Sequence, residues 1–137
     1  MIVPNLMVRD IRRSIAFYQD IIGMKPMIYV DKDQNVVTQD EDGNQQSDLV
    51  FATLEINGFQ LMLQEANSLR KETQEAVAND APCLTGTIYF RDINIKEIIP
   101  HIPKKNFIKG PISQWYGINE IYIKDPDGYT LCLGERV

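Results

Sequence analysis

The sequence predicts an α+β fold built from two βαβββ modules, and three observations support this prediction. An apolar, strand-like segment near the N-terminus is followed at once by an amphipathic helix. Asn57-Gly58 and the turn 125–128 (DPDG) each separate two apolar runs, as in β-hairpins. Two short motifs also recur along the chain, which indicates an internal repeat. With 137 residues, 44% of them apolar, the chain can bury a core without disulfides.

The first helix has clear signals at both ends. Residues 2–8 are apolar and partly β-branched, as in a strand, and Asp10 then stands where a helix N-cap belongs. Gly23 is placed to end the helix. Between them, apolar residues recur with the spacing of one helix face, namely Ile11, Ile15, Tyr18 and Ile22.

The rest of the first module, which is predicted to span about residues 1–65, consists of strands. One strand is expected at 25–31, and two more, 49–56 and 59–65, flank Asn57-Gly58. The polar segment 32–48 is expected to be a long exposed loop or a ragged hairpin. A solvated linker helix follows within about 66–81.

The second module is predicted to span about residues 82–137, so that the whole chain, 1–137, forms one domain. A strand is expected over 85–90. Asn94 and Glu97 then have the spacing of a capping box for a short helix, which Pro100 ends. The last two strands, 117–123 and 129–134, flank the DPDG turn.

The internal repeat rests on two pairs of motifs. MVRDI (7–11) matches YFRDI (89–93), each at a junction of strand and helix, and NGFQLML (57–63) matches DGYTLCL (127–133). The offsets are 82 and 70 residues, so the first copy carries an insertion of about twelve, which the segment 32–48 can hold. One half cannot bury its sheet alone, and two such halves are therefore expected to pack together.

Charge and composition restrict the function. The net charge of −5 argues against a nucleic-acid partner, which requires clustered lysine and arginine. No apolar run approaches the roughly eighteen residues of a membrane span, and the N-terminus lacks a signal peptide's pattern. Two cysteines form no disulfide framework, so a cytoplasmic location is expected. The acidic balance favours a cationic or neutral ligand.

The two ends of the chain resemble a known family. VPNLMVRDIRRSIAFYQDIIGM (3–24) resembles the first strand and helix of the glyoxalase/bleomycin-resistance proteins, in the vicinal-oxygen-chelate superfamily, whose "FY…LG" signature falls on Phe17, Tyr18 and Gly23. YGINEIYIKDPDGYTLCLGE (116–135) resembles the last hairpin of that family. The resemblance implies two βαβββ modules whose curved sheets form a cleft, which a second subunit of a homodimer completes.

The resemblance also implies where a metal would bind. Metal-using members place ligands on the first and last strand of each module, which here correspond to Val3, Met62, Thr85 and Cys132. None of them is the histidine or carboxylate that a divalent cation prefers. A shift of one or two residues brings in only Asn5, Gln60, Gln64 or Thr130, and the single histidine, His101, lies elsewhere. We therefore expect no metal and no cofactor, as in the bleomycin-resistance type.

Without a metal, the cleft wall must bind the ligand, a small organic molecule. Alternation along the strands, with Val50, Ala52 and Leu54 facing the core, predicts which residues face inward: Asn5, Phe51, Met62, Thr87, Tyr89, Glu120, Tyr122 and Cys132. The alternative is that these side chains fill a sheet interface. Cys132 is interpreted as a small buried residue rather than as a nucleophile.

An aromatic pair and a glutamate complete the predicted site. Trp115 and Tyr116 precede Gly117, where bleomycin-resistance proteins carry a similar aromatic–glycine step that stacks on flat cationic drugs. Their alternative role is to pin the loop 110–117 to the core. Glu120 either supplies a countercharge for a cationic ligand or is an ordinary surface residue.

Three functions remain open at this point. The first is metal-free sequestration of an aromatic or cationic compound, such as an antibiotic. The second is a metal-dependent lyase, isomerase or dioxygenase, which the fold supports only by analogy. The third is a metal-free enzyme that uses Glu120, Tyr122 or Tyr89 as an acid or base.

Overall fold

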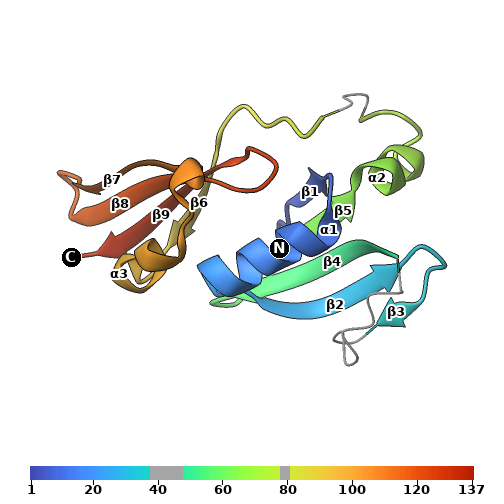
Figure 1. The fold of residues 1–137 in the computed structure, drawn as a ribbon, viewed down its shortest axis with the longest axis horizontal. Coiled ribbons are helices and arrows are strands. Elements are labelled where there is room, and N and C mark those ends of the chain that lie inside the picture. The colour runs from blue at the N-terminus through green and yellow to red at the C-terminus, as the bar shows by residue number, and fades with distance from the viewer. Residues whose placement is uncertain (38–47, 78–80) are drawn as a thin grey trace. The chain divides into compact units, whose positions relative to one another are not determined.

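The computed structural model describes residues 1–37, 48–77 and 81–137, and it divides the chain into two compact units, Met1–Pro82 and Cys83–Val137. Each unit contains one mixed sheet and a helix packed on it (Figure 1). This is the predicted α+β architecture. None of the helices in the described part of the chain is long and apolar enough to cross a membrane.

The sheet of the first unit has five strands in the order β1-β5-β4-β2-β3. β1 runs parallel to β5, and the other neighbours are antiparallel. Asn57 and Gly58 both have positive φ, 52° and 82°, as the predicted β4–β5 hairpin requires. The strands are β1 (Asn5–Val8), β2 (Lys25–Asp31), β3 (Val36–Val37), β4 (Leu49–Ile56) and β5 (Phe59–Glu65).

Helix α1 (Ile11–Phe17) confirms the sequence prediction at both ends. The carboxylate of Asp10 accepts a hydrogen bond from the backbone N–H of Arg13 at 3.1 Å. The helix continues as a π-helical turn, η1 (Tyr18–Ile22), and ends at Gly23, whose φ is 87°. The four residues of the predicted apolar face are all buried, and with Leu54 and Leu63 of the sheet they belong to the core of this unit.

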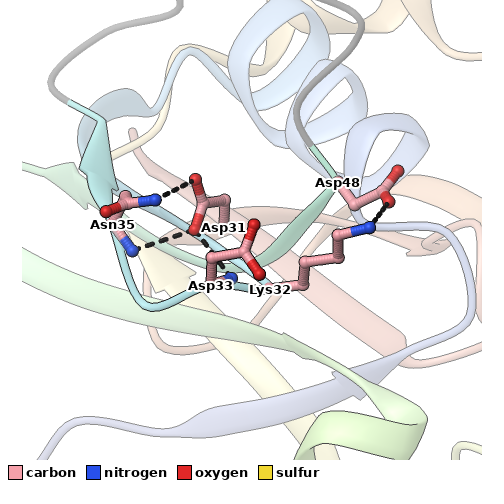
Figure 2. A network of polar contacts seen from close by, with 5 residues as sticks. All are labelled: Asp31, Lys32, Asp33, Asn35 and Asp48. Atoms are coloured by element: carbon pink, nitrogen blue, oxygen red, sulfur yellow. Dashed lines mark hydrogen bonds and ion pairs between the residues drawn. The ribbon is translucent and has the colours of Figure 1, made fainter.

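The turn between β2 and β3 confirms the ragged hairpin expected after residue 31. The Asp31 carboxylate accepts hydrogen bonds from the backbone N–H groups of Asp33 and Asn35, each at 2.9 Å, and from the Asn35 side chain at 3.1 Å (Figure 2). Lys32 forms an ion pair with Asp48 at 2.9 Å. These hydrogen bonds lower the pKa of Asp31, the largest effect coming from the Asn35 amide. The rest of the predicted loop, residues 38–47, lies outside the described residues.

Helix α2 (Ala66–Glu72) is shorter than the predicted linker helix and is not fully solvated. The Glu65 carboxylate caps it by accepting from the N–H groups of Asn67 and Ser68. Ala66 and Leu69 pack against Met7 of β1. Hydrogen bonds from Gln64 Nε2 of β5 to Ser68 and Glu72 also attach this helix to the first sheet. Residues 78–80 of the predicted linker lie outside the described part.

The second unit has the order β6-β9-β8-β7, with β6 (Thr87–Arg91), β7 (Phe107–Ser113), β8 (Ile118–Lys124) and β9 (Thr130–Arg136). Helix α3 (Ile95–Ile98) is capped by Asn94, as predicted, and Pro100 lies in the 3-10 turn η2 (Ile99–His101) that follows it. A second 3-10 turn, η3 (Lys104–Asn106), leads into β7. The sequence pattern does not indicate β7, because Gly110-Pro111 interrupts it. Proline is tolerated here because β7 is an edge strand.

The two faces of the second sheet differ in character. Ile121, Ile123, Leu131 and Leu133 are buried, together with Ile95 and Ile98 of α3, and form the core of this unit. Because side chains alternate along a strand, Glu120, Tyr122 and Cys132 lie on the opposite face. We call this face, turned away from α3, the open face.

The structure corrects the register of the internal repeat. The two helix caps are Asp10 and Asn94, 84 positions apart, rather than Asp10 and Asp92. Asp92 instead has a φ of 60° and pairs with Arg136 at 3.0 Å. The shared letters RDI therefore place the second copy two residues too early. Val3 and Thr85, the predicted ligand positions on the first strands, precede β1 and β6.

Candidate functional site

Four side chains form a row across the open face of the second sheet. Strand pairing places Tyr89 beside Cys132, Cys132 beside Tyr122, and Tyr122 beside Lys109. The neighbouring row contains Arg91, Gly134 and Glu120. On the other side of the first row, Thr87 pairs with Thr130. Adjacent strands are about 4.8 Å apart, so these rows bring together residues from all four strands.

Glu120 lies at the centre of this arrangement and is fully buried. Its Oε1 accepts hydrogen bonds from the hydroxyl groups of Tyr89 and Tyr116, each at 2.7 Å. Its Oε2 accepts from Gln114 Nε2 at 3.0 Å and, more weakly, from the Tyr122 hydroxyl at 3.4 Å. We call these five residues the tyrosine cage. Three hydroxyl groups and one amide thus surround a single carboxylate.

Gly134 makes room for one wall of the tyrosine cage. A Cβ atom at this position would overlap the Tyr89 hydroxyl and would lie 3.0 Å from Tyr89 Cζ. Tyr89 stands on β6, whereas Glu120 stands on β8, with β9 between them. The Tyr89 side chain therefore crosses the bare backbone of Gly134 to reach the carboxylate.

The cage keeps Glu120 ionised despite its burial. Burial raises the pKa of a carboxyl group, but the hydrogen bonds from Tyr116, Tyr89, Gln114 and Tyr122 outweigh that effect and lower the pKa of Glu120. The carboxylate lies under one layer of side chains, since Tyr89 and Tyr116 are themselves 39% and 47% exposed. At neutral pH the open face therefore contains a buried negative charge covered by phenol rings.

The hydroxyl groups of Tyr89, Tyr116 and Tyr122 and the thiol of Cys132 stay protonated at neutral pH. Burial and its hydrogen bond to Glu120 raise the pKa of Tyr89, and the separate hydrogen bond that Tyr116 donates to Glu120 raises the pKa of Tyr116. A hydrogen bond with Cys132 and burial raise the pKa of Tyr122 to about 12. Burial also raises the pKa of the Cys132 thiol. None of these groups is therefore prepared to act as a nucleophile or base near pH 7.

The aromatic pair Trp115 and Tyr116 lies in the turn between β7 and β8, where Gly117 N–H donates to the Gln114 carbonyl at 3.0 Å. Their ring centroids are 5.3 Å apart in an edge-to-face arrangement. Tyr116 is held by Glu120, but Trp115 is 93% exposed. The alternative in which the aromatic pair pins this loop to the core is therefore wrong for Trp115, whereas Tyr116 does attach the turn to buried Glu120. The alternative in which Glu120 is a surface residue is also wrong.

The other three candidate residues, Asn5, Phe51 and Met62, lie in the first unit. They line a pocket of about 920 Å³ on the face of the first sheet away from α1, together with α2 and the turn after β2. Asn5 Nδ2 donates to Gln64 Oε1 at 2.8 Å, and Gln64 Nε2 donates to Glu72 at 2.6 Å. Val50, predicted to face the core, also lines this pocket, because the β2–β4 register shifts beside it.

The metal-ligand positions on the last strands can be placed with the observed register. Met62 pairs with Asn5, and Cys132 pairs with Tyr89. These four side chains do not provide the histidine and carboxylate ligands that divalent cations prefer. Within residues 1–37, 48–77 and 81–137, no three histidine, cysteine, aspartate or glutamate side chains gather in one place. The described residues thus do not fit a resident metal ion at these positions.

Sequence reasoning missed Gln114, Lys109, Arg91 and Gly134 of this site. Lys109 Nζ lies 4.8 Å from the centre of the Tyr122 ring, and Arg91 Cζ lies 5.7 Å from that of Tyr89. Gln114 and Lys109 could have been found only by recognising β7 as a strand. Gly134 was visible as an isolated glycine in a strand, which often marks a close approach of another group.

Comparisons with known proteins agree with this architecture. The family model for the Glyoxalase/Bleomycin resistance protein/Dioxygenase superfamily matches residues 2–133. No functionally curated protein matches the chain. The family match thus spans nearly the whole chain, both units included.

Solved structures show the same fold at low sequence identity. A protein of unknown function from Agrobacterium tumefaciens is 24% identical over 100% of this chain and 94% of its own, with a TM-score of 0.70. A glyoxalase/bleomycin resistance protein/dioxygenase family enzyme from Burkholderia phytofirmans is 16% identical over 98% of this chain and 97% of its own, also at 0.70. A virulence protein from Salmonella typhimurium is 21% identical over 100% of this chain and 96% of its own, with a TM-score of 0.65. The chain belongs to the Glyoxalase/Bleomycin resistance protein/Dioxygenase superfamily.

Proposed function

We propose that this protein binds a small aromatic compound without a metal, and that the tyrosine cage with Trp115 forms the recognition surface. The observation that supports this most strongly is the buried, ionised Glu120 on the open face. A sheet face needs no carboxylate in order to fold, and apolar residues in place of a buried charge are often neutral or stabilising. Its presence here is explained if the carboxylate serves to orient the phenol rings for a ligand.

The geometry suits recognition of a flat ring. The hydroxyl groups of Tyr89 and Tyr116 are fixed by Glu120, so both rings lose little side-chain freedom when a ligand binds. Trp115 adds a large exposed ring beside Tyr116. Stacked or edge-to-face aromatic pairs contribute about 0.5–1.5 kcal/mol beyond the area that they bury. Fixed aromatic rings with a few placed polar groups are typical of small-molecule sites.

The pKa directions favour binding over catalysis. A general base works best with a pKa near the working pH. Here the pKa of Glu120 is lowered and its oxygens are enclosed, whereas the pKa values of Tyr89, Tyr122 and Cys132 are raised. A lyase, isomerase or dioxygenase activity of this chain would need another group to transfer protons or to bind the substrate's oxygens.

The pocket of the first unit is the alternative location. Its volume, about 920 Å³, suits a drug-sized molecule, and Phe51 and Met62 supply apolar contacts. We further propose that two copies of the chain associate, as the resemblance to the family suggests, and that the protein is cytoplasmic, as two cysteines without a disulfide framework suggest. A sedimentation mass near 15.7 kDa at micromolar concentration would contradict the homodimer.

Calorimetric titration with 2-naphthylmethanol, a neutral aromatic probe, tests the proposal. Tyr116→Ala and Trp115→Ala should each weaken binding by about 1–3 kcal/mol, as removal of an aromatic anchor commonly does. Phe59→Ala, which removes a 76% exposed aromatic side chain from β5, is the matched control and should bind as the parent does. Unchanged affinity in both turn variants, with loss in Phe51→Ala, would move the site to the first unit. Absence of binding to the parent would reject the proposal for this class of compound.

A further inference from the structure

Apart from the ion pair between Arg136 and Asp92, the exposed charges that the described strands place on the open face are positive, although the chain as a whole carries a net charge of −5. Arg91 on β6 and Lys109 on β7 are both exposed and project from this face, each over a ring of the tyrosine cage. Lys124 lies two residues beyond Tyr122 on β8 and therefore shares the face. Arg136 is already paired with Asp92. The negative charge of Glu120 is enclosed, so a ligand meets the cations first.

Arg91 and Lys109 have no carboxylate partner among the residues that the structure describes. Within the described part of the chain, neither forms a salt bridge, and Glu120 is occupied by four hydrogen-bond donors. Each cation instead rests on a tyrosine ring, at 5.7 Å for Arg91 and 4.8 Å for Lys109. A cation–π contact holds such a group in place and leaves its N–H donors available.

The tyrosine cage determines where these two cations stand. The Glu120 carboxylate accepts hydrogen bonds from the Tyr89 hydroxyl at 2.7 Å and from the Tyr122 hydroxyl at 3.4 Å, and so holds both rings in place. The Tyr89 ring in turn supports Arg91, and the Tyr122 ring supports Lys109. The rings belong to one row of residues that crosses the sheet. Among the described residues, Arg91 and Lys109 are thus two cations without a salt bridge, and they stand on the two edge strands, on either side of the aromatic surface.

We propose that the compound bound by the tyrosine cage carries an anionic group, such as an aromatic carboxylate. Lys109 and Arg91 attract this group from the two edge strands, and it pairs with one of them while the ring of the compound stacks on Tyr116 and Trp115. This inference rests on the proposed function, because it names the ligand class of the same site. It reverses the expectation of a cationic ligand with Glu120 as countercharge, since a fully buried carboxylate cannot contact such a ligand. Lys109 and Arg91 thereby become the residues that determine specificity.

Three probes of equal ring size test this assignment by calorimetry: 2-naphthoate, 2-naphthylmethanol and 2-naphthylmethylammonium. The parent should bind the anion about three- to tenfold more tightly than the neutral probe, because each partly exposed charge pair contributes modestly. The preference should shrink between about 0.01 M and about 1 M salt, since exposed charges are screened. Lys109→Met and Arg91→Met should each weaken binding of the anion more than binding of the neutral probe, and so reduce the preference.

Lys96→Met is the matched control, because Lys96 is an exposed lysine on α3, behind the sheet. It should keep the full preference for the anion. Equal or weaker binding of 2-naphthoate, with 2-naphthylmethanol still bound, would overturn the anion assignment and leave the proposed function standing. Tightest binding of the ammonium probe would restore the cationic ligand. Failure of all three probes to bind would reject the proposed function, and the anion assignment with it.

Discussion

Substitution of Gly134 by alanine tests the tyrosine cage without replacing any of its members. The new Cβ would overlap the Tyr89 hydroxyl and would lie 3.0 Å from Tyr89 Cζ and 3.1 Å from Ile118 Cγ2. Tyr89 is 39% exposed, so its ring can turn out into solvent. The substitution should therefore break the hydrogen bond from Tyr89 to Glu120 while the fold survives.

The magnitude follows from that hydrogen bond. A hydrogen bond to a charged group contributes about 1.5–3 kcal/mol, and alanine within a strand gains about 0.5–1 kcal/mol over glycine. Glu120 also keeps three other donors. We therefore expect Gly134→Ala to lower the free energy of unfolding by about 1–2 kcal/mol, measured by urea denaturation.

Two comparisons make this result specific. In a Tyr89→Ala background the overlap with the Tyr89 ring is absent and only the contact with Ile118 Cγ2 at 3.1 Å remains, so Gly134→Ala should cost clearly less stability than in the parent. Gly86→Ala is the matched glycine control, since a Cβ atom at that position would meet nothing within 4 Å and the φ of Gly86 is not positive. If Gly134→Ala were as stable as the parent, or if its effect persisted undiminished without Tyr89, the described role of Gly134 would be wrong.

Three further predictions concern titration and reactivity. The pKa of Glu120 is lowered in the folded state. The contribution of its carboxylate to stability should therefore be complete above about pH 4.3, the pKa of a free glutamate, and be lost as the pH falls through the lowered pKa. The free energy of unfolding of Glu120→Gln, measured by urea denaturation, should accordingly differ most from that of the parent near neutral pH. The pKa values of Tyr89 and Tyr122 are raised. The part of the tyrosine absorbance change that comes from these two residues should therefore occur above about pH 10, the pKa of a free tyrosine. The free energy of unfolding should fall as these two groups ionise. Cys83 is exposed and Cys132 is buried. A thiol reagent at about pH 8, near the usual thiol pKa, should therefore label Cys83 rapidly and Cys132 only on unfolding. Two rapidly reacting thiols would contradict the burial of Cys132.

Local signals in the sequence predicted most of the fold. Asp10 and Gly23 delimit the first helix because a cap and a left-handed glycine act within one turn. Asn57-Gly58 forms its hairpin for the same local reason. By contrast, β7 contains Gly110-Pro111, which is unfavourable inside a sheet and acceptable only at an edge. Edge position is a property of the assembled sheet and cannot be read from one segment.

The candidate site could be predicted only by residue type. Alternation correctly separated Glu120 and Tyr122 from Ile121 and Ile123, because side chains of a strand alternate between its faces. The partners of Glu120 come from β6 and from the turn after β7, and strand pairing alone brings them together. Burial of Glu120 depends on that covering layer. The sequence of β8 alone therefore suggests that the Glu120 carboxylate is an exposed countercharge, whereas in the structure this carboxylate is enclosed.

The location of the bound ligand tests the account most directly. Nuclear magnetic resonance of isotopically labelled protein, titrated with 2-naphthylmethanol, reports which residues the probe contacts. We expect the largest chemical-shift changes at Trp115, Tyr116 and Glu120, together with neighbours on β8 and β9. Changes confined to Phe51 and Met62 of the first unit, or no changes at saturating probe, would contradict the assignment of the tyrosine cage as the binding surface.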